Sequence, residues 1–279
     1  MITVSGIPFQ QSGQLPLSSI ERVIIQGMQN DSVVYSFQSI DELSFELKLR
    51  KNIVESAREM DQGDSHFEPF EESYCNPGYW NLTIAGGFQL KKGVKPSEAI
   101  LDIYRNSSLY AFECATAMII IYYHATLKSI GENVFNQLFQ NIYLYSWHFD
   151  PDLGIHTIHT EQFLPGDVVY FNNPDVDPDT SWWRGENAVV LEDGTFFGHG
   201  LGIRTAWHMI QLLNEKRKQG SIRSAFLTNS VTRPTFKHLA HITHIPQRAP
   251  VHKLQYIVIH HNESSISCSR YLKYLMTYR

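Results

Sequence analysis

Apolar residues recur at helical spacing through most of the first half of the chain. They predict helices over residues 17–30, 39–60, 95–105, 114–130 and 132–139. Ser39 and Glu42 have the spacing of a capping box, which supports a helix that begins there. The most apolar stretch, from Cys114 to Leu127, is 14 residues long. Because a bilayer span needs about 18 or more residues, we expect a buried core helix there.

Short runs typical of strands dominate from about residue 142 onward. They predict strands at 142–147, 167–171, 186–191, 195–199 and 224–228, with one helix over 205–218. The Glu-Asp-Gly turn at 192–194 joins two of these strands in a hairpin. A smaller hairpin is predicted over 80–90, after an irregular segment at 61–79. Helices followed by strands with short turns indicate an α+β fold with an antiparallel sheet.

The composition changes after about residue 232. Residues 233–253 contain three prolines and four histidines, and these prolines argue against a regular helix there. The apolar run Tyr256–Ile259 predicts a strand that pairs with the sheet edge or is buried against the core. We therefore divide the chain into a main domain, 1–232, and a C-terminal extension, 233–279. The extension is expected to pack on or beside the core without supplying catalytic groups.

Charge and cysteine content restrict the classes of function. The net charge of −5 argues against a general nucleic-acid binder, because no basic field neutralises phosphates. Three cysteines without CxxC or CxxH spacing predict neither a disulfide framework nor a metal site. Residues 1–10 lack the basic and apolar regions of a secretory signal. We expect synthesis in the cytosol, no membrane segment and no cofactor.

Cys114 is the first candidate for chemistry. It opens the most apolar predicted helix, where unpaired N–H groups and the helix dipole lower the pKa of a thiol toward the nucleophilic thiolate. The competing interpretation is an ordinary buried cysteine, since cysteine is among the most buried residue types.

A cysteine nucleophile needs a partner that transfers protons. Counted outward from Asp193, Glu186 and His199 are 7 and 6 residues away, so the predicted hairpin places them nearly opposite each other at its open end. Both are expected at strand ends and not in the core. A solvated salt bridge is the competing interpretation for this pair.

Several longer stretches resemble one known family. Residues 164–171, a Pro-Gly-Asp turn before an apolar strand, look like part of the NlpC/P60-type cysteine amidases. Residues 45–54, 110–117, 182–187 and 198–203 resemble the spore-coat protein-glutamine γ-glutamyltransferase (transglutaminase, Tgl) family of Bacillus-type spore formers. The resemblance extends over residues 1 to about 232.

The resemblance implies an NlpC/P60-like, papain-like core that forms γ-glutamyl-ε-lysyl isopeptide bonds between spore coat proteins without calcium. It implies Cys114 as nucleophile with Glu186 and His199 as partners, whose acid and base roles stay undivided. The enzyme would be made in the mother cell, act at the spore coat and be monomeric. A thioester intermediate must be kept from water. Aromatic residues are expected to form the substrate-binding walls, namely Phe67, Trp147 and Trp183, with Phe70 and Trp182.

Two alternatives remain, one that uses the same residues and one from a different class. An NlpC/P60-type cysteine peptidase or amidase would take water as the acyl acceptor. A non-enzymatic structural protein of the coat would need no reactive cysteine. Incorporation of an amine into a glutamine peptide distinguishes acyl transfer from both.

Overall fold

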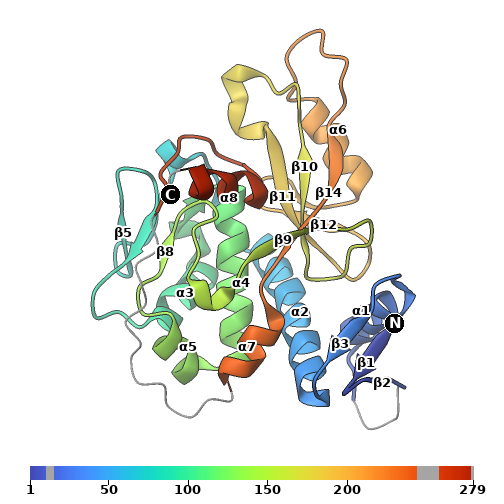
Figure 1. Ribbon diagram of the computed structural model, residues 1–279. Coiled ribbons are helices and arrows are strands. Elements are labelled where there is room, and N and C mark those ends of the chain that lie inside the picture. The colour runs from blue at the N-terminus through green and yellow to red at the C-terminus, as the bar shows by residue number, and fades with distance from the viewer. Residues whose placement is uncertain (11–15, 244–257, 278–279) are drawn as a thin grey trace.

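The computed structural model describes residues 1–10, 16–243 and 258–277 (Figure 1). Helices form where the apolar spacing predicts them, and the described residues contain two further helices near the C-terminus, α7 and α8, that the spacing did not predict. Their bounds are α1 Ser19–Asn30, α2 Ile40–Asp61, α3 Pro96–Arg105, α4 Cys114–Ile130, α5 Glu132–Leu138, α6 Ala206–Asn214, α7 Phe236–Thr243 and α8 Cys268–Thr277. Helix α6 ends four residues before the predicted end of its segment.

Helix α7 contradicts the expectation that the prolines prevent a helix after residue 233. Pro234 stands two residues before the first helical residue, Phe236, so it interrupts no helical hydrogen bond. Pro246 and the predicted strand residues Tyr256 and Ile257 lie outside the described residues. The eleven residues between Pro234 and Pro246 leave room for a helix of two turns.

The largest sheet has six antiparallel strands in the order β13-β12-β11-β10-β14-β9. Their bounds are β9 His156–His159, β10 Val168–Asn172, β11 Gly185–Val190, β12 Phe196–Gly198, β13 Gly202–Arg204 and β14 Phe226–Arg233. Strands β11 and β12 form the predicted hairpin, with Ala188 opposite Gly198. The α+β prediction is confirmed.

Three smaller sheets complete the described part of the chain. Strands β2 (Ile7–Pro8), β1 (Ile2–Val4) and β3 (Tyr35–Phe37) form one, and β4 (His66–Phe67) pairs in parallel with β7 (Ala111–Phe112). The third contains the predicted hairpin of β5 (Trp80–Leu82) and β6 (Phe88–Leu90), extended by β8 (Tyr143–Leu144). The pairing of β4 with β7 brings the irregular segment after α2 beside the residues that precede α4.

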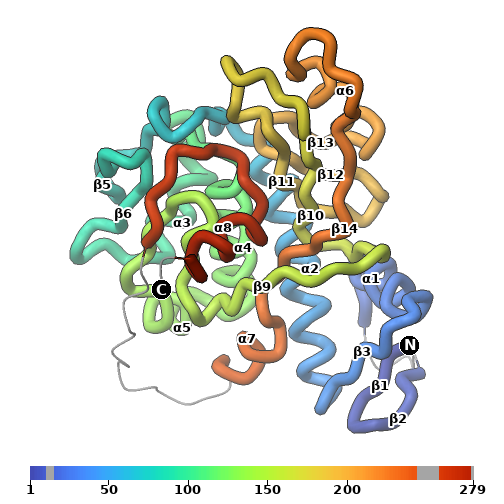
Figure 2. The backbone as a smooth tube through the Cα atoms, turned by 45° about the horizontal axis from the view of Figure 1, so that its top comes forward, coloured from blue at the N-terminus to red at the C-terminus, as the bar shows by residue number. Residues whose placement is uncertain are grey.

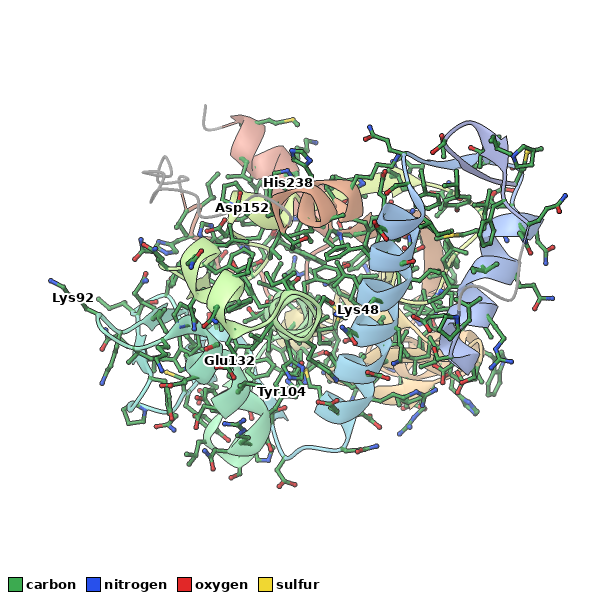
Figure 3. All side chains as sticks on the ribbon, turned by 90° about the horizontal axis from the view of Figure 1, so that it is seen from below. Lys48, Lys92, Tyr104, Glu132, Asp152 and His238 are labelled. Atoms are coloured by element: carbon green, nitrogen blue, oxygen red, sulfur yellow. The ribbon has the colours of Figure 1, made fainter. Side chains whose placement is uncertain are left out.

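Helix α4 lies at the centre of the core. All but two of its residues are buried, which agrees with the predicted core helix. Figure 3 shows α2 beside it, and the labelled Lys48 donates from Nζ to the carbonyl oxygen of Ser129 near the end of α4, at 2.8 Å. No helix in the described ranges is long and apolar enough to cross a membrane.

A buried ion-pair network joins α2 to the sheet. The guanidinium of Arg50 is 2.9 Å from Glu46 and 2.8 Å from Asp167, and it is fully buried. Arg233, at the end of β14, contacts the other oxygen of Asp167 at 2.9 Å. Because both cations are held by one carboxylate, the network fixes α2 relative to β10 and β14.

The C-terminal segment returns across the start of α4. Figures 1 and 2 show α8 and the residues before it, in red, over the end of α4 where that helix begins. Cys268 and Tyr271 on α8 are 1% exposed. The described part of the extension therefore packs on the core, and its position relative to Cys114 is taken up below.

Candidate functional site

Cys114 is the first residue of α4, and the preceding residue, Glu113, is the N-cap. The Glu113 carboxylate accepts hydrogen bonds from the backbone N–H groups of Ala115 at 2.9 Å and Thr116 at 2.7 Å. This satisfies two of the unpaired donors at the helix N-terminus and fixes where the helix begins. The Cys114 side chain is thereby held at the helix N-terminus, as predicted, although it is 0% exposed.

Strand β11 lies against this end of α4. Asn187 donates from Nδ2 to Cys114 Sγ at 3.3 Å, and the same amide donates to the carbonyl oxygen of Ile266 at 2.9 Å. Glu186 is 0% exposed, which contradicts the expectation of a solvated strand end. Strand β11 pairs with β10 and β12 along its two edges, α2 and α4 pack against it, and all its residues are buried.

The carboxyl group of Glu186 lies directly over Gly198 of β12. A Cβ added at Gly198 would be 2.7 Å from Cγ and 2.8 Å from Oε1 of Glu186, so only glycine leaves room for this side chain. Among the described residues, neither oxygen of Glu186 has a hydrogen-bond partner of ordinary geometry. Burial raises the pKa of Glu186 well above its ordinary range, and the nearby N–H groups of Gly200 and His199 only partly oppose this effect.

The thiol of Cys114 differs from the sequence prediction. Burial, followed by the charges of Glu186 and Glu113, raises the pKa of Cys114 well above its ordinary value. The helix N-terminus favours the thiolate, but removal of water and two nearby carboxylates favour the neutral thiol and dominate. In this conformation Cys114 is protonated at neutral pH, and the predicted depression of its pKa is wrong.

His199 lies beyond Phe112. Its ring stacks on Phe112 with centroids 4.4 Å apart, and its Nε2 lies 3.0 Å from the carbonyl oxygen of His66. Since a carbonyl only accepts, Nε2 carries the proton. Burial lowers the pKa of His199 to about 4, so the ring is neutral. Within the described residues no hydrogen bond joins His199 to Cys114, whereas Glu186 is close enough to Cys114 to act on its pKa.

The predicted wall residues form two groups. Phe67 stacks on Trp183 with centroids 5.1 Å apart, and both rings lie against Gly200 beside His199. Trp147 is fully buried and donates from Nε1 to the carbonyl oxygen of Ile266 at 2.9 Å. Phe67 and Trp183 therefore belong to the surroundings of His199, and Trp147 to the surroundings of the C-terminal segment.

Three residues that touch the site were not predicted. Glu113 is visible in the sequence as a carboxylate directly before an apolar helix, where the helix dipole favours a negative charge. Asn187 and Ser265 carry no comparable signal, because their proximity to Cys114 depends on long-range packing. No group of three or more His, Cys, Asp or Glu within the described ranges is placed to hold a metal ion.

A family model, curated relatives and a solved structure all match this chain to one family. Residues 1–243 match the family protein-glutamine gamma-glutamyltransferase. A protein-glutamine gamma-glutamyltransferase of Halalkalibacterium halodurans is 52% identical over 277 residues, 99% of this chain and 98% of the relative. One from Bacillus cereus strain B4264 is 46% identical over 226 residues, 81% of this chain and 82% of the relative. A solved transglutaminase from Geobacillus stearothermophilus, without its C-terminal extension, is 47% identical with a TM-score of 0.71 and covers 75% of this chain and 100% of its own.

Proposed function

The chain belongs to the protein-glutamine γ-glutamyltransferase family, and from this membership we propose how its own residues perform the acyl transfer. The activity is that of a transglutaminase, an acyltransferase that joins the side chain of a protein glutamine to an amine. In the proposed first step Cys114 Sγ attacks the glutamine carboxamide. The C–N bond breaks, ammonia leaves, and a thioester remains. An amine then attacks the thioester and releases Sγ.

We assign proton transfer to Glu186. In its carboxylate form it accepts the proton of the Cys114 thiol as the S–C bond forms, and it returns this proton to the leaving ammonia. It then takes a proton from the attacking amine, and the thiol is restored at the end of the cycle. One observation carries this assignment: Glu186 is a fully buried carboxyl group without a hydrogen-bond partner among the described residues, close enough to Cys114 to shift its pKa.

His199 was predicted as a catalytic partner, and we propose a narrower role as a positioning residue. In the neutral ring, Nε2 carries the proton and donates it in a hydrogen bond to the carbonyl oxygen of His66. The ring itself stacks on Phe112. This anchors the turn that follows β12, in which the N–H groups of His199 and Gly200 face the Glu186 carboxyl group. Phe67 and Trp183 would exclude water from this side of the site, and Trp147 from the other.

The finer predictions remain proposals. We propose that the acceptor lysines and donor glutamines belong to spore coat proteins, that the enzyme acts at the spore coat after synthesis in the mother cell, and that it works as a monomer without calcium or a cofactor. The family resemblance supports these points. A helix that begins at the nucleophile and packs on an antiparallel sheet supports the proposed NlpC/P60-like arrangement of the core. The division into domain 1–232 and extension 233–279 is likewise a proposal.

The test is incorporation of a fluorescent primary amine into a glutamine peptide, measured together with ammonia release. Wild type is expected to release one ammonia for each amine incorporated. Cys114→Ala should abolish both, whereas Cys75→Ala, which changes a partly buried cysteine without a role in the proposed mechanism, should abolish neither. Ammonia release without amine incorporation would indicate the hydrolytic alternative. Retention of transfer in Cys114→Ala would refute the nucleophile.

A further inference from the structure

The C-terminal segment closes the site over Cys114. Residues 258–277 return from the far end of the chain over the start of α4 (Figure 2), and Ser265 lies close enough to Cys114 to act on the pKa of its thiol. The backbone N–H of Ser265 also donates to Oε2 of Glu113 at 3.0 Å. Since Cys114 is 0% exposed, no glutamine carboxamide can reach Sγ while this segment is in place.

The core holds this segment by its main chain. Trp147 Nε1 and Asn187 Nδ2 both donate to the carbonyl oxygen of Ile266, each at 2.9 Å. The hydroxyl of Tyr170 donates to the carbonyl oxygen of Ser265 at 3.1 Å. Three donors on the core therefore face two successive carbonyl groups.

One acceptor on the core completes this arrangement. The Glu113 carboxylate accepts a hydrogen bond from the backbone N–H of Ser265. The core therefore contacts both the donors and the acceptors of the peptide backbone. Contacts of this kind recognise any peptide in an extended or turn conformation, because they involve no side chain of the bound segment. If the segment leaves, these buried groups lose their partners, which is unfavourable unless another chain replaces it.

The segment is anchored on both sides of Ser265. Before it, His261 Nε2 lies 3.1 Å from Ser146 Oγ, and Glu263 contacts Arg184 of the core at 3.1 Å. After it, Ile266 is fully buried and Tyr271 of α8 is 1% exposed. These anchors are side chains of the extension packed on the core, so a single substitution in α8 can weaken them.

Ser265 itself has a φ of 60°. This left-handed conformation is unfavourable for a residue with a side chain other than Asn or Asp, so the segment is strained at the point where it meets the nucleophile. A substrate peptide without this strain would compete with it more easily.

We propose that the groove formed by Glu113, Trp147, Tyr170 and Asn187 binds the main chain of the glutamine-donor polypeptide. Residues 263–267 occupy this groove in the free enzyme and must leave before acyl transfer begins. This inference rests on the proposed role of Cys114 as nucleophile. The ligand class is a polypeptide segment, and the extension is its intramolecular competitor.

The experiment weakens the anchor in the full-length chain. Tyr271→Asp places a charge at a buried position of α8, whereas Lys273→Ala changes an exposed residue of the same helix and serves as the matched control. Two rates are measured: alkylation of Cys114 by iodoacetamide, located by peptide mapping, and kcat/KM for amine incorporation into a short glutamine peptide. A site that is open only a tenth of the time gains about tenfold in apparent affinity when its cover is released. We expect Tyr271→Asp to raise both rates by about that factor and Lys273→Ala to leave them unchanged.

A second arm restores the cover. A synthetic peptide of residues 258–277, added to the Tyr271→Asp protein, should slow alkylation again, and the same peptide with Ile266→Asp should not. If Tyr271→Asp does not fold, Glu263→Ala replaces it, because Glu263 is partly exposed and its loss removes the contact with Arg184. Unchanged alkylation and kcat/KM in a variant whose extension has become sensitive to protease would overturn the inference. If alkylation becomes faster but no variant incorporates the amine, residues 263–267 do cover Cys114. The proposed acyl transfer would then be refuted, and the inference about the segment would stand.

Discussion

At the scale of single residues, Glu186 carries the sharpest signal. Among the described residues this buried carboxyl group has no hydrogen-bond partner of ordinary geometry, which is unfavourable, and such groups persist in folded proteins where they serve a function. The ion pairs of Arg50 are different, because every one of its charged neighbours is directly engaged. Glu186, which lacks such a partner, is therefore the candidate for proton transfer, whereas Glu46 and Asp167, which pair with Arg50, have a structural role.

Glu186→Gln is expected to lower kcat/KM for amine incorporation by about 10²–10⁴-fold, the usual contribution of a general acid–base group. The amide has the shape of the carboxyl group but cannot carry the proton. Glu215→Gln, which changes an exposed carboxylate, serves as the control. Circular dichroism checks that both variants are folded. A Glu186→Gln protein with wild-type kcat/KM would exclude this residue as the proton carrier.

The pH dependence of Cys114 alkylation follows from the pKa shifts. The thiolate is the reactive form, and the pKa of Cys114 is raised, so the rate should rise with pH and reach half its maximum above the value for free cysteine. Because the charge of Glu186 contributes to this shift, Glu186→Gln should move the midpoint to lower pH. A midpoint that stays constant in Glu186→Gln would show that the two groups do not interact.

At the scale of elements, the β11–β12 hairpin decides where the carboxyl group lies. Ala188 pairs with Gly198, and the Glu186 side chain crosses over that glycine. The sequence places Glu186 and His199 on the two arms of this hairpin. Which of them points at Cys114 depends on the packing of the hairpin against α4.

Gly198→Ala tests this close contact. The added methyl group would lie within 3 Å of the Glu186 carboxyl group and must displace it. Displacement of a catalytic group by about 1 Å can cost about 10²-fold in rate, and we expect a loss of kcat/KM of that order. Enzyme kinetics and thermal melting are measured together. A fall in melting temperature without any loss of kcat/KM would indicate that the glycine serves packing alone.

At the scale of the whole molecule, the Arg50 network joins α2, β10 and β14. Arg50→Met leaves Asp167 buried with one cation instead of two and is expected to lower the free energy of unfolding by about 3–5 kcal/mol. Arg58→Met removes a partly exposed pair with Glu192 and Asp193, and should cost less than about 1 kcal/mol. Urea denaturation measures both variants. Equal losses would mean that burial does not determine the strength of these pairs.

Much of the architecture follows from local pattern. The apolar spacing predicts α2 and α4 nearly to the residue, and the Glu-Asp-Gly turn predicts the β11–β12 hairpin, because helix and hairpin formation depend on neighbours in the sequence. Strand β9 was not predicted, since its His-Thr-Ile-His sequence has only one strongly apolar residue and is stabilised by pairing with β14. Helix α7 was not predicted because residues 233–253 are rich in proline, but no proline lies within its eight residues.

The sequence by itself determined the α+β class, the family and the position of Cys114 at the start of a core helix. Only the tertiary structure decided the protonation state of that cysteine, because the electrostatic effect of the helix N-terminus is local, whereas burial and nearby carboxylates come from distant segments. It likewise decided that Glu186 acts on the pKa of the thiol, whereas no hydrogen bond joins His199 to Cys114 within the described residues. The same long-range packing brings Ser265 onto Cys114 across 151 positions of the chain, a contact that no periodicity or motif can encode.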